Sequence, residues 1–394
     1  MTARALRWLL VTTLAVVLAA CSGPILANPP LLEVAPSAAP ATPAPPPDPV
    51  AVSFPRDDGP HDRLTEWWYY TGHLVAADGR RFGFEAVVFR AERGAAPTAW
   101  ASHLALTDES GRRFLYAQRA EIGGQVDASP RGADGSPTGF DLRLGSLPLE
   151  NGEYPPDSTT WRLAGSGGID TIDAVLTSAE AAAAGAPFGL QLSLAPSRPA
   201  VLHGGDGWID LGRAGGSYYY SRTRMAATGT LTLDGVPLQV TGSAWFDHQW
   251  GDFISVGAGG WDWFAVNLDD GTDLTLSLVR AKDGSFPLVY GMLLRPDGSV
   301  ADLGPQAFTI AATGTWTSPR TGATYPSGWR IGIPGEGLVI GLTPSLADQE
   351  LDTRATTGVV YWEGSQWVEA ERGPRRFVGG EAYVELTGYA TPGP

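Results

Sequence analysis

Residues 66–74 read EWWYYTGHL: one carboxylate, four consecutive aromatic residues, a Thr-Gly pair and a histidine. Side chains alternate between the two faces of an extended strand, so Glu66, Trp68 and Tyr70 are expected to share one face. Rings also occupy the other face, and a strand with large rings on both faces is usually covered on both sides. We therefore interpret this stretch as a buried strand of a β-domain whose rings form a wall.

The aromatic pattern of residues 67–74 occurs a second time, at residues 261–268. Each copy is followed by an Asp-Gly turn and then by a strand of alternating apolar residues, and the two series superimpose with one two-residue gap. A repeated opening of this kind indicates two domains of one type. We predict a first domain over residues 51–248 and a second domain over residues 249–394.

The rest of the chain has the features of β-structure. Its 51 glycines and 32 prolines argue against long helices, and short alternating runs are separated by Asp-Gly or Pro-Asp-Gly turns. We expect hairpins around residues 234–235 and 296–298, a half-buried strand at 274–278, and one helix at 178–185 capped by Ser178. The 14 tryptophans suit barrels whose interiors are filled or lined by rings. The predicted fold class is all-β, with two tandem antiparallel β-barrels.

The first fifty residues predict export and anchoring. Residues 1–20 have the basic start and short apolar core of a signal peptide, and their end, Leu-Ala-Ala before Cys21, resembles the lipobox of bacterial lipoproteins. Cys21 is the only cysteine, so no disulfide can form within one chain. Residues 21–50 are rich in Pro and Ala and read as an extended tether. We expect a bacterial envelope protein held in a membrane through lipidated Cys21, with Ser22 favouring the outer membrane.

Charge and motifs exclude several classes of function. The chain carries 42 acidic against 27 basic residues, a formal charge of −15, which makes nucleic acid and anionic lipid headgroups poor partners. No glycine-rich phosphate loop is present, so no nucleotide cofactor is predicted. The five histidines show no metal-ligand spacing, and no metal is predicted. No G-x-S-x-G elbow supports a hydrolase, and nothing in the sequence supports a triad of Ser221, His248 and Asp247.

Five motifs in order resemble one family. The motifs are FPRDDGPHDRLTEWWYYTGHL, YYYSRTRMAATGTLTLDG, GSAWFDHQWG, WDWFAVNLDDGT, and YWEG with GGEAYVELTGY. They resemble the AttH-like, carotenoid 1,2-hydratase-related family, many of whose members are labelled predicted secreted hydrolases. The resemblance covers residues 54–390 and implies two tandem lipocalin-like β-barrels. It also implies chemistry on an isoprenoid double bond, which needs an acid, an apolar slot and aromatic faces that stabilise a carbocation.

The sequence departs from the hydratases at one pair of residues, which includes the proposed acid. The resemblance implies a His-x-Trp pair, present as His248 and Trp250, and a Tyr-x-Asp pair on a strand downstream. Thr275 and Ser277 stand at that downstream spacing, and a hydroxyl of ordinary pKa cannot protonate an alkene. Asp262, between two tryptophans, is the best substitute acid if burial raises its pKa. It could equally point outward or pair with an arginine.

These observations define a set of candidate site residues. Asp262, His248 and Asp247 are the candidate catalytic residues; Asp247 could orient the imidazole or cap a turn. The candidate ligand-binding residues are Trp250, Trp261, Trp263, Trp68, Tyr70 and Glu66, although each ring could simply belong to the core.

The favoured function is that of a membrane-tethered lipocalin-like protein that binds an apolar ligand, either an isoprenoid or an acyl lipid. The alternative is an enzyme of the carotenoid 1,2-hydratase or secreted-hydrolase type acting on such a ligand. A third possibility is an envelope scaffold, which solidly filled barrels would favour.

Overall fold

The computed structural model describes residues 48–147, 152–154, 156–166, 168–212, 215–253, 258–373 and 376–390. The predicted signal peptide, Cys21 and most of the predicted tether lie outside these described residues. Within them, no helix is both long enough and apolar enough to cross a membrane.

The first of two large antiparallel sheets has the strand order β4-β3-β2-β1-β12-β11-β8-β7-β6-β5, with β9 and β10 paired to β11. Its strands are β1 (Thr65–Ala76), β2 (Arg81–Ala91), β3 (Ala99–Asp108), β4 (Arg113–Ile122), β5 (Phe140–Gly145), β6 (Thr160–Ser166), β7 (Ile169–Val175), β8 (Phe188–Pro196), β9 (Val201–Leu202), β10 (Trp208–Asp210), β11 (Gly216–Leu233) and β12 (Val236–Gly251). The sheet curls until its two end strands meet. There Arg119 of β4 donates to the Leu144 carbonyl of β5 at 3.0 Å, so side chains close the barrel where the ladder ends.

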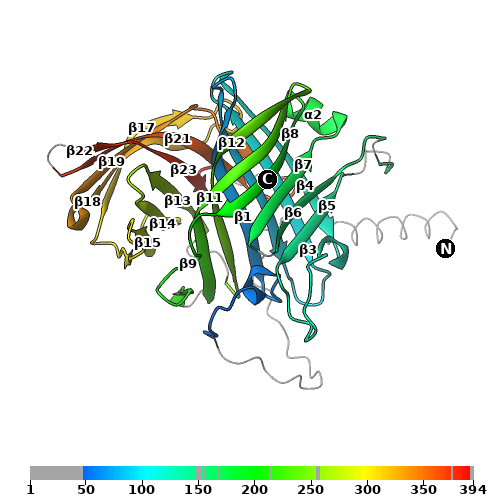
Figure 1. Ribbon diagram of the computed structural model, residues 1–394, viewed down its shortest axis with the longest axis horizontal. Coiled ribbons are helices and arrows are strands. Elements are labelled where there is room, and N and C mark those ends of the chain that lie inside the picture. Colours follow the sequence, from blue (N-terminus) through cyan, green and yellow to red (C-terminus); the bar gives the residue numbers. More distant parts are fainter. Residues whose placement is uncertain are drawn as a thin grey trace, which may run out of the picture.

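The second sheet has the order β16-β15-β14-β13-β23-β21-β19-β18-β17, with β20 and β22 paired to β21. Its strands are β13 (Ala258–Leu268), β14 (Asp273–Ala281), β15 (Leu288–Leu294), β16 (Val300–Asp302), β17 (Thr309–Thr317), β18 (Thr324–Ile333), β19 (Leu338–Pro344), β20 (Glu350–Asp352), β21 (Val360–Arg372), β22 (Arg376–Val378) and β23 (Gly380–Thr387). Figure 1 shows the two curled sheets side by side. The predicted all-β fold with two tandem barrels is confirmed. The first sheet ends at Gly251, so residue 248 lies within β12.

The helices in the described part of the chain are short. They are η1 (Arg56–Asp58), η2 (Gly124–Val126), α2 (Ser178–Ala184) and η4 (Pro334–Glu336). The expected helix at 178–185 is present, but its N-cap is Thr177, which accepts from the Glu180 amide in a capping box. The prediction of Ser178 as the cap was wrong by one residue, because Ser178 already has helical geometry.

Both copies of the aromatic pattern open a barrel in the same way. β1 pairs with β2 and with the last strand of its sheet, β12, and β13 pairs with β14 and with its own last strand, β23. Tyr69 and Trp263 occupy equivalent positions, and their rings meet edge to face at 5.3 Å across the interface between the sheets. The rings on the second face of each opening strand therefore bury one another.

The interface and the two barrel interiors are filled by side chains. The interface cluster consists of Tyr69, Val87, Phe89, Ala91, Ala101, Trp245, Trp263, Ala265 and Tyr383. Within the first barrel the largest fully buried aromatic side chains are Trp68, Trp100, Trp161, Tyr70, Tyr220, Phe82 and Phe84. The strand expected at 274–278 is buried on both faces, because Thr275 and Ser277 face the interface while the leucines fill the second barrel. The prediction that this strand is half-buried was therefore wrong.

Candidate functional site

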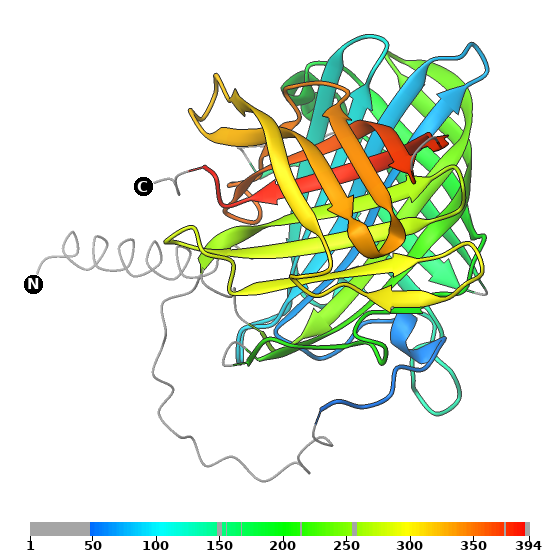
Figure 2. The same cartoon turned by 90° about the vertical axis from the view of Figure 1, so that its left-hand side faces the viewer.

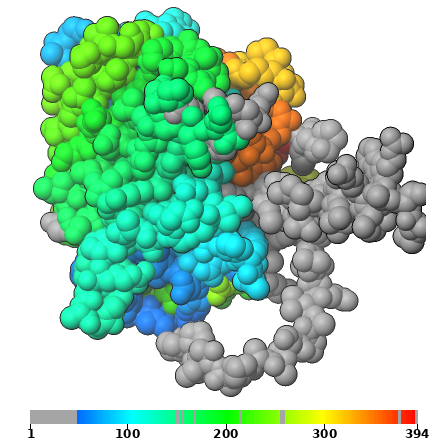
Figure 3. Space-filling model, turned by 90° about the vertical axis from the view of Figure 1, so that its right-hand side faces the viewer, coloured from blue at the N-terminus to red at the C-terminus, as the bar shows by residue number. Residues whose placement is uncertain are grey.

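One end of the first barrel is covered by the chain that precedes β1. Residues 48–64, including η1, cross the lower end of the barrel in Figure 1 and in the view at right angles to it (Figure 2). In the space-filling view, blue atoms from this part of the chain lie at the same end (Figure 3). We call residues 48–64 the cover. It closes an end of the barrel that no strand closes.

Polar and aromatic contacts hold the cover in place. The Asp58 carboxylate accepts hydrogen bonds from Tyr220 and Arg222, each at 2.6 Å, and its backbone carbonyl accepts one from the Trp68 indole at 3.0 Å. Phe54 packs edge to face on Tyr220 with ring centroids 4.8 Å apart. Side chains of the cover therefore enter the mouth of the barrel and contact its inner wall.

Glu66 lies at the centre of this end, fully buried between two histidines. Its Oε1 atom lies 2.7 Å from Nδ1 of His61 on the cover and 2.9 Å from Nε2 of His248 on β12. The His61 amide donates to the other carboxylate oxygen, Oε2, at 3.0 Å. In the β1–β12 ladder Glu66 pairs with Trp250, and His248 lies two residues from Trp250 on the same face of β12. The side chains of Glu66 and His248 therefore both point into the barrel.

Aromatic rings enclose this polar centre. His61 stacks on Trp250 with parallel rings whose centroids are 4.1 Å apart, and the centroid of the His248 ring lies 4.6 Å from that of Trp68 and 4.7 Å from that of Trp250. Tyr220 meets His248 edge to face at 5.4 Å. A buried carboxylate and two imidazoles surrounded by indole and phenol rings combine proton donors and acceptors with faces that stabilise positive charge.

Each histidine also has a hydrogen-bond partner on its outer side. Nε2 of His61 lies 3.4 Å from the Asp57 carboxylate, and Nδ1 of His248 lies 3.4 Å from the Tyr220 hydroxyl. Burial by itself would raise the pKa of Glu66, but the charge and hydrogen bonds of His61 and His248 outweigh it and hold that pKa below its ordinary value. Burial lowers the pKa of His248, against the effect of Glu66.

Two ring nitrogens and one carboxylate oxygen at the centre form a set that could hold a metal ion. One donor atom each from His61, Glu66 and His248 lie within 4.8 Å of one another. The spacing of histidines along the sequence predicted no metal site, because Glu66 and His248 are 182 residues apart and only the ladder joins them.

Comparison with known proteins places the chain in a family. A family model described as AttH-like matches residues 45–389. The chain belongs to the AttH-like family. Among solved structures, an AttH protein from Nitrosomonas europaea is 31% identical, with a TM-score of 0.70, and the match covers 89% of this chain and 100% of that chain.

Two more distant structures share the fold with this AttH-like protein. Kievitone hydratase from Nectria haematococca is 16% identical, with a TM-score of 0.59, over 86% of this chain and 94% of that chain. CghA is 14% identical, with a TM-score of 0.51, over 84% of this chain and 90% of that chain. No curated protein matches the AttH-like chain significantly.

The structure brings together one group of the residues predicted from the sequence. Glu66, Trp68, His248 and Trp250 all meet at the covered end of the first barrel. Tyr70 lies deeper on the same face of β1, where its hydroxyl donates to Asp170 at 2.8 Å and its ring stacks on Phe246. The interior face of β1, inferred from alternation, is the face that carries the site.

The other predicted residues lie elsewhere. Asp262 faces the second barrel, where it accepts from Arg280 at 2.7 Å and from Tyr389 at 2.9 Å, so the expected alternative of an arginine partner is the one observed. Burial nevertheless raises the pKa of Asp262, since it outweighs that arginine. Trp263 and Trp261 belong to the interface between the sheets. The structure therefore does not bring Asp262 to His248.

Asp247 also lies in the interface, on the opposite face of β12 from His248. It accepts hydrogen bonds from Tyr219, Ser221 and Trp245, and burial raises its pKa to about 6. The Ser221 hydroxyl lies between Asp247 and Nε2 of His203. A hydrolytic triad needs the histidine between serine and carboxylate, and here the serine is in the middle.

The sequence reasoning missed His61, Asp58 and Tyr220 as parts of the site. His61 and Asp58 lie in the FPRDDGPHD stretch directly before β1, and its clustering of charge next to the aromatic strand was an available signal. Their positions depend on the turn that brings the cover back across the barrel. Nothing in the periodicity of the strands predicts that turn.

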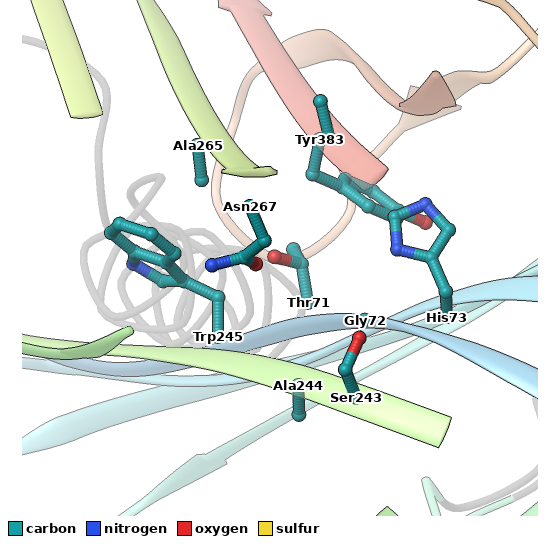
Figure 4. A pocket seen from close by; sticks show the side chains of 10 residues that line it. Thr71, Gly72, His73, Ser243, Ala244, Trp245, Ala265, Asn267 and Tyr383 are labelled. Atoms are coloured by element: carbon teal, nitrogen blue, oxygen red, sulfur yellow. The ribbon is translucent and has the colours of Figure 1, made fainter. Parts of the chain in front are cut away.

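Two hollows occur elsewhere in the described part of the molecule. A cavity of about 10 Å³, enough for roughly one water, lies between the sheets and is lined by residues such as Thr71, His73 and Tyr383 (Figure 4). A groove of about 470 Å³ runs between residues 198–205 and 294–300. It contains none of the residues predicted for the site.

Proposed function

We propose that this AttH-like protein binds an apolar small molecule, an isoprenoid or an acyl lipid, at the covered end of the first barrel. The observation that carries the proposal is the buried Glu66–His248 pair, which lies among aromatic rings beneath the cover. The cover is not part of either sheet. Ligand sites combine apolar walls with a few convergent polar groups, and this end of the barrel has both.

The cover occupies the space that the ligand would take. His61 stacks on Trp250, and Phe54, 42% exposed, packs on Tyr220. Each such aromatic contact contributes about 0.5–1.5 kcal/mol beyond the area that it buries, which a ring or alkene of the ligand would match. The ligand therefore binds by displacing the cover and keeps the same walls. The barrel below is solidly filled, which is the observation that favours the alternative of an envelope scaffold, so the binding proposal requires displacement of the cover.

The predicted membrane tether agrees with this arrangement. Residues 48–50 of the cover are the last three residues of the predicted tether of residues 21–50, so the segment that covers the site continues directly from the segment predicted to follow the anchor at Cys21. A lipid-derived ligand would then be taken up close to the membrane that supplies it.

A second candidate function is hydration of an alkene in the same place. Imidazole and carboxyl groups supply and remove protons, and the faces of Trp68 and Trp250 would stabilise a cationic intermediate. The chain shares its fold with kievitone hydratase, but at 16% identity that likeness shows the fold alone, so the candidate rests on the residues at the covered end. In this scheme a protonated His61, whose pKa Glu66 and Asp57 raise despite burial, donates the proton to the alkene and replaces the acid that is missing at Thr275 and Ser277.

Ligand capture tests the binding proposal. Purified full-length protein is incubated with bacterial lipid extract, separated from free lipid and analysed by mass spectrometry. We expect one class of apolar compound to co-elute, and Trp250→Leu to reduce its amount at least fivefold. The matched control is Trp367→Leu, which changes a half-exposed tryptophan on the second sheet, 46% exposed. Equal capture by both variants, or none by the native protein, would contradict the proposal.

Turnover distinguishes the second candidate. If the captured compound gains the mass of one water during incubation with native protein, and Glu66→Gln binds it without that gain, the protein is a hydratase. A captured compound that is recovered unchanged supports binding alone.

A further inference from the structure

We propose that His61, Glu66 and His248 form a binding site for one divalent transition-metal ion of the zinc class. The site shares the covered end of the barrel with the proposed ligand, but it goes beyond that proposal, because metal binding requires no organic ligand.

The donor atoms already converge on one point. Nδ1 of His61 and Nε2 of His248 both point at Oε1 of Glu66, at 2.7 and 2.9 Å, and the three ligand atoms lie within 4.8 Å of one another. Zinc binds nitrogen and oxygen at about 2.0–2.2 Å, so tetrahedral donors lie about 3.3–3.5 Å apart. An ion between the three groups therefore requires the His61–Glu66 and the His248–Glu66 separations each to widen by about 0.5 Å.

The hydrogen bonds around the two imidazoles leave His248 with a conflict that a metal ion resolves. Each ring has an acceptor on both nitrogens: Glu66 and Asp57 for His61, and Glu66 and the Tyr220 oxygen for His248. The Tyr220 proton is already donated to Asp58. A neutral imidazole has only one N–H, so a neutral His248 cannot donate both to Glu66 and to the Tyr220 oxygen, whereas a protonated His61 can donate to both of its acceptors.

With a metal between the rings, the same partners become ordinary outer contacts of a metal site. Each inner nitrogen gives its lone pair to the ion, and each outer N–H is donated, by His61 to Asp57 and by His248 to the Tyr220 oxygen. Histidine ligands almost always donate the second N–H to a carboxylate or another oxygen in this way. The arrangement seen here is that pattern on both histidines.

The carboxylate is held in the orientation that a ligand needs. Oε2 of Glu66 accepts from the His61 amide at 3.0 Å and lies 4.0 Å from the Arg90 guanidinium, which leaves Oε1 to face the two rings. A set of two histidines and one carboxylate with an open position favours Zn²⁺, Co²⁺ or Fe²⁺ over Mg²⁺ or Ca²⁺, which prefer oxygen ligands alone. The nearby carboxylates Asp57 and Asp58 are already paired with Arg56 and Arg222, so affinity for the ion would come from the three donor groups themselves.

A metal ion here would fasten the cover to the barrel. His61 comes from the cover, Glu66 from β1 and His248 from β12, so one ion would join three segments that are distant in sequence. Metal binding is coupled to the ordering of the segments that supply the ligands. We therefore expect the bound ion to slow proteolysis within residues 48–64.

Cobalt is the probe. Full-length protein is treated with a chelator, dialysed and titrated with Co²⁺ in the absence of any lipid, with visible absorption and elemental analysis as readouts. We expect one equivalent of Co²⁺ with the d–d bands of a four- or five-coordinate site, displaced by Zn²⁺. His61→Ala should weaken binding at least tenfold while the protein stays folded, because His61 lies on the cover and its side chain is 19% exposed.

The matched control is His73→Ala, which removes a histidine that faces the interface from the same strand as Glu66. Absence of a stoichiometric site, or equal affinities for His61→Ala and His73→Ala, would overturn the proposal. Failure of lipid capture with an intact cobalt site would instead reject the proposed ligand, so the two proposals fail separately.

Discussion

At the scale of single residues, the covered end of the barrel depends on charges that are buried together. Arg222 donates to Asp58 of the cover at 2.6 Å and lies 3.3 Å from Asp170 on β7. Burial raises the pKa of Asp170 to about 6 although Arg222 and Tyr70 lower it. One guanidinium thus ties the cover to the interior and keeps a buried carboxylate partnered.

Replacement of that guanidinium should be costly. Arg222→Met leaves Asp170 buried without its cation, and breaking a buried pair in this way costs about 3–5 kcal/mol of unfolding free energy. Arg143→Met is the control, because Arg143 pairs with Asp141 at the surface with 48% of its side chain exposed, so its loss should lower the unfolding free energy far less. Urea denaturation measures both. Similar losses of unfolding free energy for the two variants would show that the buried Arg222 pairs stabilise the protein no more than the surface pair does.

At the scale of elements, β1 is an inner strand of the first barrel and also a wall of the interface. Its alternation sends Glu66, Trp68 and Tyr70 inward and Tyr69 outward, as the sequence periodicity predicted. Gly72 lies at a close approach to β12, where an added Cβ would be 2.3 Å from the Ser243 carbonyl oxygen and 2.6 Å from the Phe84 ring.

A single methyl group added at Gly72 should therefore push β1 and its neighbours apart and destabilise the fold. We expect Gly72→Ala to lower the unfolding free energy by about 1–3 kcal/mol, the usual cost of overpacking a filled interior. Gly304→Ala is the control, since its added Cβ would have no atom within 4 Å. Thermal unfolding followed by circular dichroism compares them. If Gly72→Ala is as stable as the control, the two strands are less closely packed than described.

At the scale of the whole molecule, the two barrels are joined through an interface that contains carboxyl groups. Glu85 and Glu363 are fully buried there, and burial raises the pKa of each above its ordinary value. Burial likewise raises the pKa of Glu385 from 4.5 to about 7, although a hydrogen bond from Trp261 opposes the shift. The interface is therefore most favourable when these groups are protonated.

Stability should consequently fall as the pH rises through this range. Between about pH 4.5 and 7, Glu385 is ionised in the unfolded chain but still protonated in the folded chain. Over this range the group therefore lowers the free energy of unfolding by on the order of 2 kcal/mol. Glu385→Gln should remove that part of the pH dependence. The measurement is the unfolding free energy at pH 5 and pH 7.5 for both proteins. An unchanged slope in the variant would mean that Glu385 is ionised in the interface.

The sequence predicted the large features of the fold because those features are periodic. Alternation predicted the inward face of β1, the Asp-Gly pair predicted the β11–β12 hairpin with its turn at Asp234 and Gly235, and the aromatic echo predicted the second barrel. The position of Asp262 was not predictable, because its partner Arg280 comes from a neighbouring strand. The role of His61 depends on how an irregular segment crosses a barrel end, which has no periodic signal.

The central claim is that ligand binds at the covered end of the first barrel by displacing residues 48–64. Hydrogen–deuterium exchange with and without the captured compound tests this claim most directly. We expect faster exchange in the cover and slower exchange near Trp68 in β1 and near His248 in β12, with the second sheet unchanged. Slower exchange confined to residues 198–205 and 294–300 would place the ligand in the surface groove and contradict the account.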